Sequence, residues 1–297
     1  MPTRFDHVVI AVRDLDTAIK QFQRLGFDAR PGGRHTGRGT HNGLIRFGLD
    51  YVELLSVYDE AEARANNSRG QTILDALNGR EAAPVGFALA TEHIEEEAER
   101  FKGNEAEVAQ PHALHRTRPD GQKLTWRTLS PGGASWNRPW PFLIQWDTPD
   151  QQRLQIDPPG THPNGTIGWV RVVVATRNLN SALDVYQNQL GLELVKRDVA
   201  ASQHAHHAAF ILGKGTIDLL EPDGVGPVQD GLFEKGEGPF ALSFAVKNLE
   251  QTRAFLEEGG IQFEHETEET GRLVITPSEA LGVRIDLVSP NNESQRT

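Results

Sequence analysis

Two side chains lie where ordinary strand packing does not explain them. His7 begins an apolar, β-branched run, and strand alternation places residues 7, 9 and 11 on one face of that strand. Glu53 lies between two apolar residues in a later run, where a buried carboxylate needs a metal ion, a cation or a proton. The structural alternatives are a histidine bonded to backbone at a strand edge and an ion pair between Glu53 and Arg46. We favour a functional role for both residues, with Glu53 as a catalytic group.

The segment "GRHTGRGTHN" contains three glycines among histidines and arginines and is typical of a loop between two strands. Polar loops of this kind often close over ligands. His41 is expected to donate to a substrate oxygen or to act as a third metal ligand, and Asn42 and Arg46 are expected to bind substrate. The alternative is a solvated hairpin tip.

Aromatic residues are concentrated between positions 126 and 146. Aromatic walls suit an apolar or planar ligand, so Trp126 and Trp146 are expected to bind substrate. Core packing is the alternative for at least two of the four tryptophans in this region. Gln145 lies between an isoleucine and a tryptophan in a predicted strand, where its amide needs a buried partner. We treat it as a candidate metal ligand.

A histidine cluster, "QHAHHAAF", precedes a strand in the second half of the chain. His204 and His206 are two residues apart and could share one face of a strand and bind metal. The pattern is more typical of an exposed loop. No glycine-rich phosphate loop and no nucleophile elbow is present, which argues against phosphoryl transfer and serine hydrolase chemistry.

The elements that must position these residues form an internal repeat. The segment "HVVIAVRDLDTAIKQFQRLGF" matches "RVVVATRNLNSALDVYQNQLGL" with an offset of 164 that becomes 165, so one residue is inserted in the second helix. Each copy predicts a strand, an Asp or Asn helix cap, an amphipathic helix and a glycine at its end. Three further strands complete the first copy, at 27–35, 42–49 and 51–57.

Two weaker copies follow the same order of elements, which gives four βαβββ modules in an α+β fold. A segment rich in proline and glycine separates the second copy from the third and is expected to lack regular structure. The predicted organisation is an N-terminal domain 1–148 with modules 5–57 and 84–147, a linker 149–166, and a C-terminal domain 167–297 with modules 167–222 and 238–290.

Composition narrows the possible partners. Thirty basic and forty-one acidic residues give a formal charge of −11, and no basic stretch interleaved with aromatics resembles a nucleic-acid face. The absence of cysteine excludes disulfides and thiolate chemistry. No apolar run approaches the length of a signal-peptide core or a membrane span. We expect a cytoplasmic protein without nucleic-acid or membrane partners.

Paired βαβββ units with a histidine at a strand start and an acid in a last strand resemble the vicinal oxygen chelate superfamily, which includes glyoxalase I and extradiol dioxygenases. The first half more narrowly resembles the glyoxalase-like domain family, through "DHVVIAVRDLD", "GGRHTGRGTHN", "YVELLSV", "RPDGQKLTWR" and "PFLIQW". The resemblance covers the whole chain and implies that the four modules pair into two cup-shaped domains.

The resemblance also implies a metal site built from the first and last strands of each module. In the N-terminal domain those positions are His7, Glu53, Gly86 and Gln145, so a divalent Zn, Ni, Mn or Fe would have His7, Glu53 and Gln145 as ligands, with none from Gly86. The matching C-terminal positions contain no histidine, which argues against an extradiol iron site; they are Arg171, Asp218, Ala241 and Asp286.

The leading functional expectation is a divalent-metal-dependent lyase or isomerase of the glyoxalase type, acting on a small substrate with vicinal oxygens. A metal-free protein that sequesters an aromatic or drug-like compound is the alternative, and the gap at Gly86 supports it. An extradiol dioxygenase is a weaker third reading. The chain is expected to be a monomer or a homodimer.

Overall fold

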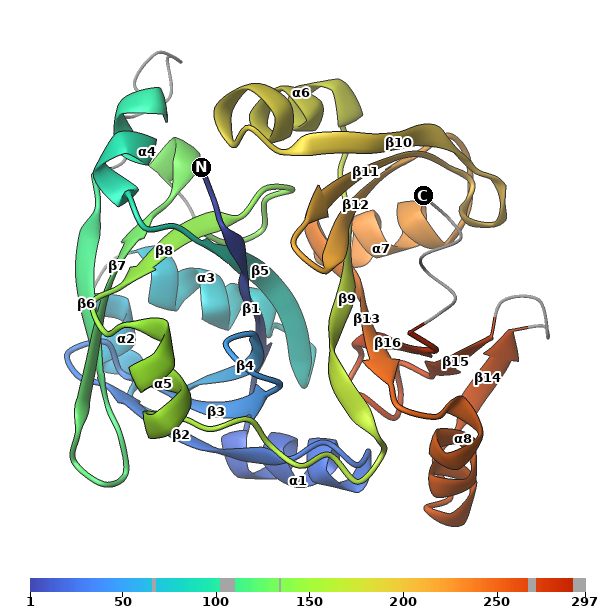
Figure 1. Ribbon diagram of the computed structural model, residues 1–297, viewed down its shortest axis with the longest axis horizontal. Coiled ribbons are helices and arrows are strands. Elements are labelled where there is room, and N and C mark those ends of the chain that lie inside the picture. The colour runs from blue at the N-terminus through green and yellow to red at the C-terminus, as the bar shows by residue number, and fades with distance from the viewer. Residues whose placement is uncertain (66–67, 102–109, 134, 267–270, 291–297) are drawn as a thin grey trace.

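The computed structural model describes residues 1–65, 68–101, 110–133, 135–266 and 271–290. The first half of the chain closes into a barrel of eight strands, seen on the left of Figure 1. Around the barrel the strands follow the order β1-β4-β3-β2-β6-β7-β8-β5. Their bounds are β1 (Arg4–Val12), β2 (Ala29–His35), β3 (Thr40–Arg46), β4 (Tyr51–Val57), β5 (Ala82–Ala90), β6 (His112–Thr117), β7 (Lys123–Leu129) and β8 (Phe142–Trp146).

The helices of this half are α1 (Leu15–Arg24), α2 (Glu60–Ala65), α3 (Ser68–Ala76) and α4 (Ile94–Phe101), followed by a 3₁₀ turn at Pro131–Gly133. Helices α1 and α4 are the module helices that periodicity predicts. Helices α2 and α3 join the two modules and were not expected. They lie against the barrel and contribute Ala63, Gly70 and Ile73 to the wall of an interior cavity.

The second half forms an open sheet with the order β10-β11-β12-β9-β13-β16-β15-β14, on the right of Figure 1. Its strands are β9 (Thr166–Ala175), β10 (Glu193–Ala200), β11 (Ala205–Leu212), β12 (Gly215–Pro222), β13 (Gly238–Val246), β14 (Phe263–Glu266), β15 (Arg272–Ile275) and β16 (Arg284–Val288). Its helical segments are α6 (Leu179–Asp184), a π-helical turn at Val185–Gln189, a 3₁₀ turn at Ala201–Gln203, α7 (Pro227–Lys235) and α8 (Leu249–Glu258).

These assignments confirm the α+β fold built from repeated modules. The side chain of Asp14 accepts from Thr17 N at 2.7 Å, and Asn178 caps the matching helix through Ser181 N at 2.9 Å. The residue inserted in the second copy coincides with the π-helical turn, which holds one more residue per turn than an α-helix and keeps the buried face in phase.

The segment between the halves is more ordered than its composition suggests. Helix α5 (Asp150–Ile156) occupies its first part, so the expectation that the whole segment lacks regular structure is wrong. His162, in the second part, is buried; its Nδ1 accepts from Asp28 N at 3.0 Å, and its Nε2 lies 3.1 Å from the carbonyl oxygen of Arg46. The connection is therefore folded against the barrel.

One hydrophobic core runs through both halves. The rings of Phe5 in β1 and Trp169 in β9 lie 4.2 Å apart, and those of Phe27 and Phe244 lie 5.6 Å apart. Strand β1, which holds His7, is thus packed on one face by the second half of the chain. None of the helices in the described ranges is long and apolar enough to cross a membrane.

Candidate active site

A cavity opens inside the N-terminal barrel, with about 940 Å³ of empty space when the open solvent at its mouth is counted. Seven of the barrel strands, all but β5, contribute side chains to it, together with helices α2 and α3. Aromatic and aliphatic walls surround a few charged and polar groups, a combination typical of small-molecule sites. Six residues expected from the sequence line this cavity: His7, Asn42, Arg46, Glu53, Trp126 and Trp146.

His7 is held from two sides. Its Nδ1 lies 2.8 Å from Oδ1 of Asp6, and its ring stacks on Tyr51 with 4.6 Å between the ring centroids. A β-bulge at this point sets Asp6 and His7 together opposite Ala88 of β5, which brings two neighbouring side chains together. With Nδ1 engaged, Nε2 faces Glu53 at 3.7 Å from Oε2.

Asp6 is fully buried among donors. Its Oδ2 accepts from Nη1 of Arg4 at 2.8 Å and from Nε1 of Trp146 at 3.0 Å, and Nη1 of Arg153 lies 3.7 Å away. Burial by itself would raise the pKa of Asp6. The hydrogen bond to His7 and the two guanidinium groups outweigh burial and hold the pKa of Asp6 well below its usual range. A fixed negative charge therefore stands behind His7.

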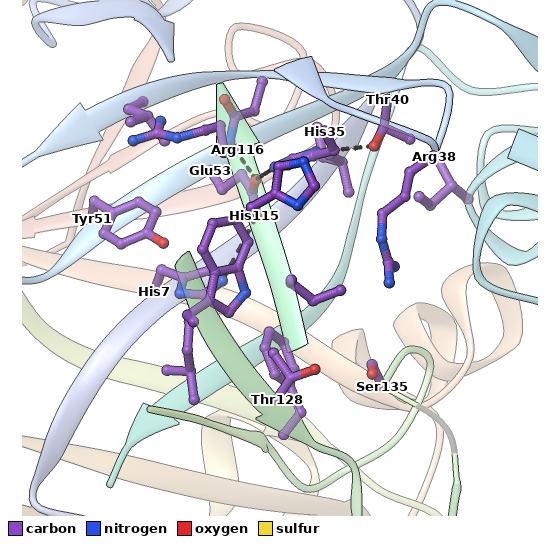
Figure 2. Close-up of a pocket in the computed structure, with 18 of the residues that line it drawn as sticks. His7, His35, Arg38, Thr40, Tyr51, Glu53, His115, Arg116, Thr128 and Ser135 are labelled. Atoms are coloured by element: carbon purple, nitrogen blue, oxygen red, sulfur yellow. Dashed lines mark hydrogen bonds and ion pairs between the residues drawn. The ribbon is translucent and has the colours of Figure 1, made fainter. Parts of the chain in front are cut away.

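Glu53 lies on the cavity wall between two imidazoles, as Figure 2 shows. Nδ2 of Asn42 donates to its Oε1 at 2.6 Å, and Nε2 of His35 lies 3.8 Å from the same oxygen. Among the described residues Arg46 pairs with Asp157 at 3.6 Å and not with Glu53. The carboxylate is thus oriented by an amide and flanked by histidines.

His35 is a site residue that the sequence analysis did not single out. Its Nδ1 lies 3.0 Å from the hydroxyl of Thr40, and its ring meets Trp126 edge to face. Burial lowers the pKa of His35 to about 4, which the nearby Glu53 only partly offsets. The imidazole is therefore neutral near pH 7. The sequence contains a pattern that could have identified His35. Strand alternation places Thr40 on the same face as Asn42, and His35 lies opposite Thr40 across the turn.

The tryptophans divide between the cavity and the core. Trp126 and Trp146 lie with ring centroids 5.0 Å apart on the cavity wall, and Trp136 joins them. The guanidinium of Arg153, from helix α5, stacks 3.8 Å from the ring centroid of Trp146 and fixes that ring from behind. Trp140 packs against the main core instead.

His41 does not reach the cavity. It follows Thr40 and precedes Asn42, which both face inward, so alternation turns His41 to the outside of the barrel. Its ring contacts Tyr58 at 5.6 Å. The expected contact of His41 with substrate or metal is therefore wrong, and the segment around it is mostly strand, with a short turn at 36–39 in place of a long loop.

Gln145 also lies on the outer face. Phe142, Ile144 and Trp146 line the cavity, so the alternate residue Gln145 points away from it. Its Oε1 accepts from the backbone N of Ile94 at 2.9 Å and so satisfies the start of helix α4. This amide has the buried partner that the sequence required, and it is not brought to His7 and Glu53.

The remaining ligand position, Gly86, is filled by a neighbouring segment. A Cβ built on Gly86 lies 2.7 Å from the carbonyl oxygen of Ser135 and 2.8 Å from the ring of Trp136. Within the described ranges no group of three or more His, Cys, Asp or Glu is arranged to hold a metal ion. The side chains present therefore do not fit the expected centre.

The C-terminal half has a cluster of charged side chains at the positions that correspond to His7 and Glu53. Nε of Arg171 lies 3.2 Å from Oδ2 of Asp218, and Nε2 of His207 lies 3.1 Å from the same oxygen. The carboxylates of Asp218 and Asp198 raise the pKa of His207 against the opposing effect of burial. The neighbouring histidines of the cluster, His204 and His206, are exposed.

Both halves of the chain match known protein families. Residues 5–178 match the glyoxalase-like domain, and residues 166–287 match the glyoxalase/bleomycin resistance protein/dioxygenase superfamily. The chain therefore belongs to the glyoxalase-like domain family, within the superfamily to which the sequence motifs point. That superfamily includes enzymes and hosts several chemistries, so membership establishes fold and family and leaves the reaction to the site.

Individual relatives agree on the architecture. The chain is 25% identical over 126 residues to the uncharacterized protein YqjC of Bacillus subtilis (strain 168), a match covering 40% of this chain and 90% of that protein. A hypothetical protein from Staphylococcus aureus superposes with a TM-score of 0.68 at 17% identity, covering 96% of this chain and 98% of the other. A mutant of 4-hydroxymandelate synthase from Streptomyces coelicolor gives 0.69 at 14% identity, with coverages of 98% and 93%. These structural likenesses show the fold.

Proposed function

We propose that the N-terminal barrel is the active site of an isomerase or lyase that moves a proton on a small substrate, with Glu53 as the base. The observation that carries the proposal is the placement of the Glu53 carboxylate between Nε2 of His7 and Nε2 of His35 on the cavity wall. A carboxylate in this setting can accept a proton from a carbon next to a carbonyl group.

The surrounding groups support each part of that step. Asn42 fixes the direction of the carboxylate through Oε1 and leaves Oε2 toward His7. A neutral His35 that accepts the Thr40 hydroxyl at Nδ1 carries its proton on Nε2, where it donates to a substrate oxygen on which negative charge develops. A positioned general base of this kind contributes roughly 10²- to 10⁴-fold in rate.

Superfamily members often bind divalent metals, and the sequence motifs led us to expect one here. Because Gln145 faces outward and the place of a side chain at Gly86 is filled, the proposal assigns the proton transfer to Glu53, His7 and His35 alone.

Deuterium exchange tests the proposal without a known substrate. The protein is incubated in D₂O with a panel of 2-oxo acids, 2-hydroxy ketones and thiol adducts of 2-oxoaldehydes, and loss of the proton next to the carbonyl is followed by ¹H NMR. We expect exchange with at least one class, and we expect Glu53→Gln to abolish it while ligand-induced thermal stabilisation persists. Binding without exchange or turnover across the panel would overturn the proposal.

A metal-free binding protein is the second candidate, and the wall formed by Trp126, Trp136 and Trp146 favours it. Sequestration needs no base, so Glu53→Gln would then change affinity only through lost contacts. The same exchange experiment separates the two functions, because a sequestering protein leaves the carbon-bound protons of its ligand in place.

A further inference from the structure

The cavity holds more positive than negative charge. Among the described residues, three guanidinium groups line it, from Arg38, Arg46 and Arg116, against one lining carboxylate, that of Glu53. Arg46 and Arg116 share Asp157, which lies 3.6 Å from the first and accepts from Nη2 of the second at 2.7 Å. Each of these two arginines therefore has a carboxylate within 4 Å, although Asp157 carries one negative charge and also pairs with Arg118.

Arg38 differs from these two arginines. It comes from the turn between β2 and β3, and Figure 2 shows its side chain extending beside the cavity, on the side opposite Tyr51. Among the residues that the structure describes, no carboxylate forms an ion pair with it. Burial lowers the pKa of Arg38, as expected for a guanidinium partly withdrawn from water without a counter-charge. An anionic ligand group would supply that charge.

Unpartnered polar atoms belong to residues around the same space. Nη1 of Arg116, Nε of Arg46, Nε1 of Trp136 and Oγ1 of Thr128 are buried without a hydrogen-bond partner in the described part of the chain, as is the acceptor Oδ1 of Asn42, and all five residues line the cavity. Buried N–H and O–H groups are normally satisfied, so the excess of donors over acceptors in this set favours a ligand with acceptor oxygens.

The remaining wall is aromatic and apolar. Trp126 and Trp146 present neighbouring rings, and Trp136 meets Phe142 edge to face with centroids 5.5 Å apart. Aromatic side chains in this arrangement bind planar groups well, because stacking adds to the burial of apolar area.

We propose that the substrate is a planar carboxylate, an aromatic or conjugated acid whose carboxylate pairs with Arg38 and whose flat body lies against the tryptophan wall. The inference rests on the proposed function for the reaction at Glu53, while the binding mode can be tested by itself. In this mode the charged end of the ligand is fixed at Arg38, and the body of the ligand extends into the space between Glu53 and the tryptophans.

Binding of cinnamate and of its neutral analogue cinnamamide tests the proposal. Titration calorimetry is run on the wild-type chain, on Arg38→Gln and on the matched control Arg34→Gln. Arg34 is exposed and lies 4.9 Å above the ring of Tyr58, outside the cavity. Because a hydrogen bond to a charged group contributes about 1.5–3 kcal/mol, we expect cinnamate to bind roughly ten- to a hundredfold more tightly than the amide.

Arg38→Gln should remove that preference, and Arg34→Gln should leave it within about twofold, with thermal melting as the check that both variants fold. Equal affinity for acid and amide, or equal behaviour of the two variants, would overturn the proposed substrate class. Exchange confined to neutral carbonyl compounds would also overturn it and leave the proposed proton transfer intact. Acid binding through Arg38 without any exchange has the opposite meaning: the binding mode stands and the reaction fails.

Discussion

Nδ1 of His7 lies 2.8 Å from Oδ1 of Asp6, although the two residues are neighbours in one strand and regular alternation would send them to opposite faces. The bulge that sets both opposite Ala88 makes this contact possible. As a result His7 presents Nε2 to the cavity with a buried, ionised carboxylate behind it.

Replacement of Asp6 by Asn should destabilise the fold by about 3 kcal/mol, because Arg153 and Arg4 lose a buried counter-charge. Urea unfolding measures the loss. Long-range ¹H–¹⁵N NMR correlations should show the proton of His7 on Nδ1 in the wild-type chain and partly on Nε2 in the variant. Asp14→Asn is the control, since that exposed cap keeps its function with either residue. An unchanged His7 tautomer would contradict the positioning role of Asp6.

Stability should rise with pH between about 4 and 6.5 through His35. The pKa of about 4 in the folded chain lies below the ordinary histidine value of 6.5, so the unfolded chain binds more protons across this window. The contribution of His35 is complete above 6.5 and is lost as the pH falls toward 4, with an upper limit of about 3 kcal/mol.

Urea unfolding at several pH values compares His35→Gln with the wild-type chain. The variant should have a flatter profile across the window, whereas His93→Gln, at an exposed histidine, should match the wild type. A profile that stays equally steep without His35 would assign the dependence to other groups.

Gly86→Ala should cost about 1–3 kcal/mol, because the added Cβ meets the Ser135 carbonyl oxygen and the ring of Trp136. Displacement of that ring should also weaken cinnamate binding. Gly48→Ala is the matched control, since its Cβ has only an ordinary contact at 3.5 Å with Asp50. The melting temperature reports the loss of stability, and calorimetry reports the weaker binding of cinnamate. Equal behaviour of the two variants would show that the structure accommodates a Cβ at Gly86 without cost.

Chelation should leave the site intact. Since Gln145 faces outward and no ligand side chain fits at Gly86, we expect EDTA treatment to change neither the melting temperature nor cinnamate affinity. Elemental analysis of protein purified without chelators, and again after soaking with Ni, Zn, Mn or Fe, provides the check. Stoichiometric metal that disappears in His7→Ala would contradict the ligand geometry described above.

Much of the fold could be predicted because the modules repeat. Periodicity predicts an amphipathic helix in the first copy, and the apolar residues of its repeating face, Leu15, Ala18, Ile19 and Phe22, are all buried. Strand β4 begins and ends where its apolar run does, at Tyr51 and Val57. Closure of the first half into a barrel, and the open sheet in the second, depend on strand contacts far apart in the chain and are not visible in local patterns.

The site was harder to predict, because the face on which a strand side chain lies depends on the exact alternation along the strand. A shift of one residue moves a strand side chain from one face to the other, which is why Asn42 lies in the cavity and His41 outside it. The prediction that Gln145 is a metal ligand was wrong for the same reason, because Gln145 lies on the outer face of its strand. Asp6 could not be predicted for the opposite reason, because the bulge breaks the alternation that a regular strand would have.

Helix α5 supplies contacts to the barrel although it contributes no strand to it. A fragment that ends at residue 148 would encode all eight barrel strands, yet it would lack Arg153, which lies over Trp146 and beside Asp6. A fragment that keeps the barrel therefore also needs the segment that follows it, and it would still expose the face of β1 that packs against the second half. The family match, which runs from residue 5 to residue 178, includes helix α5.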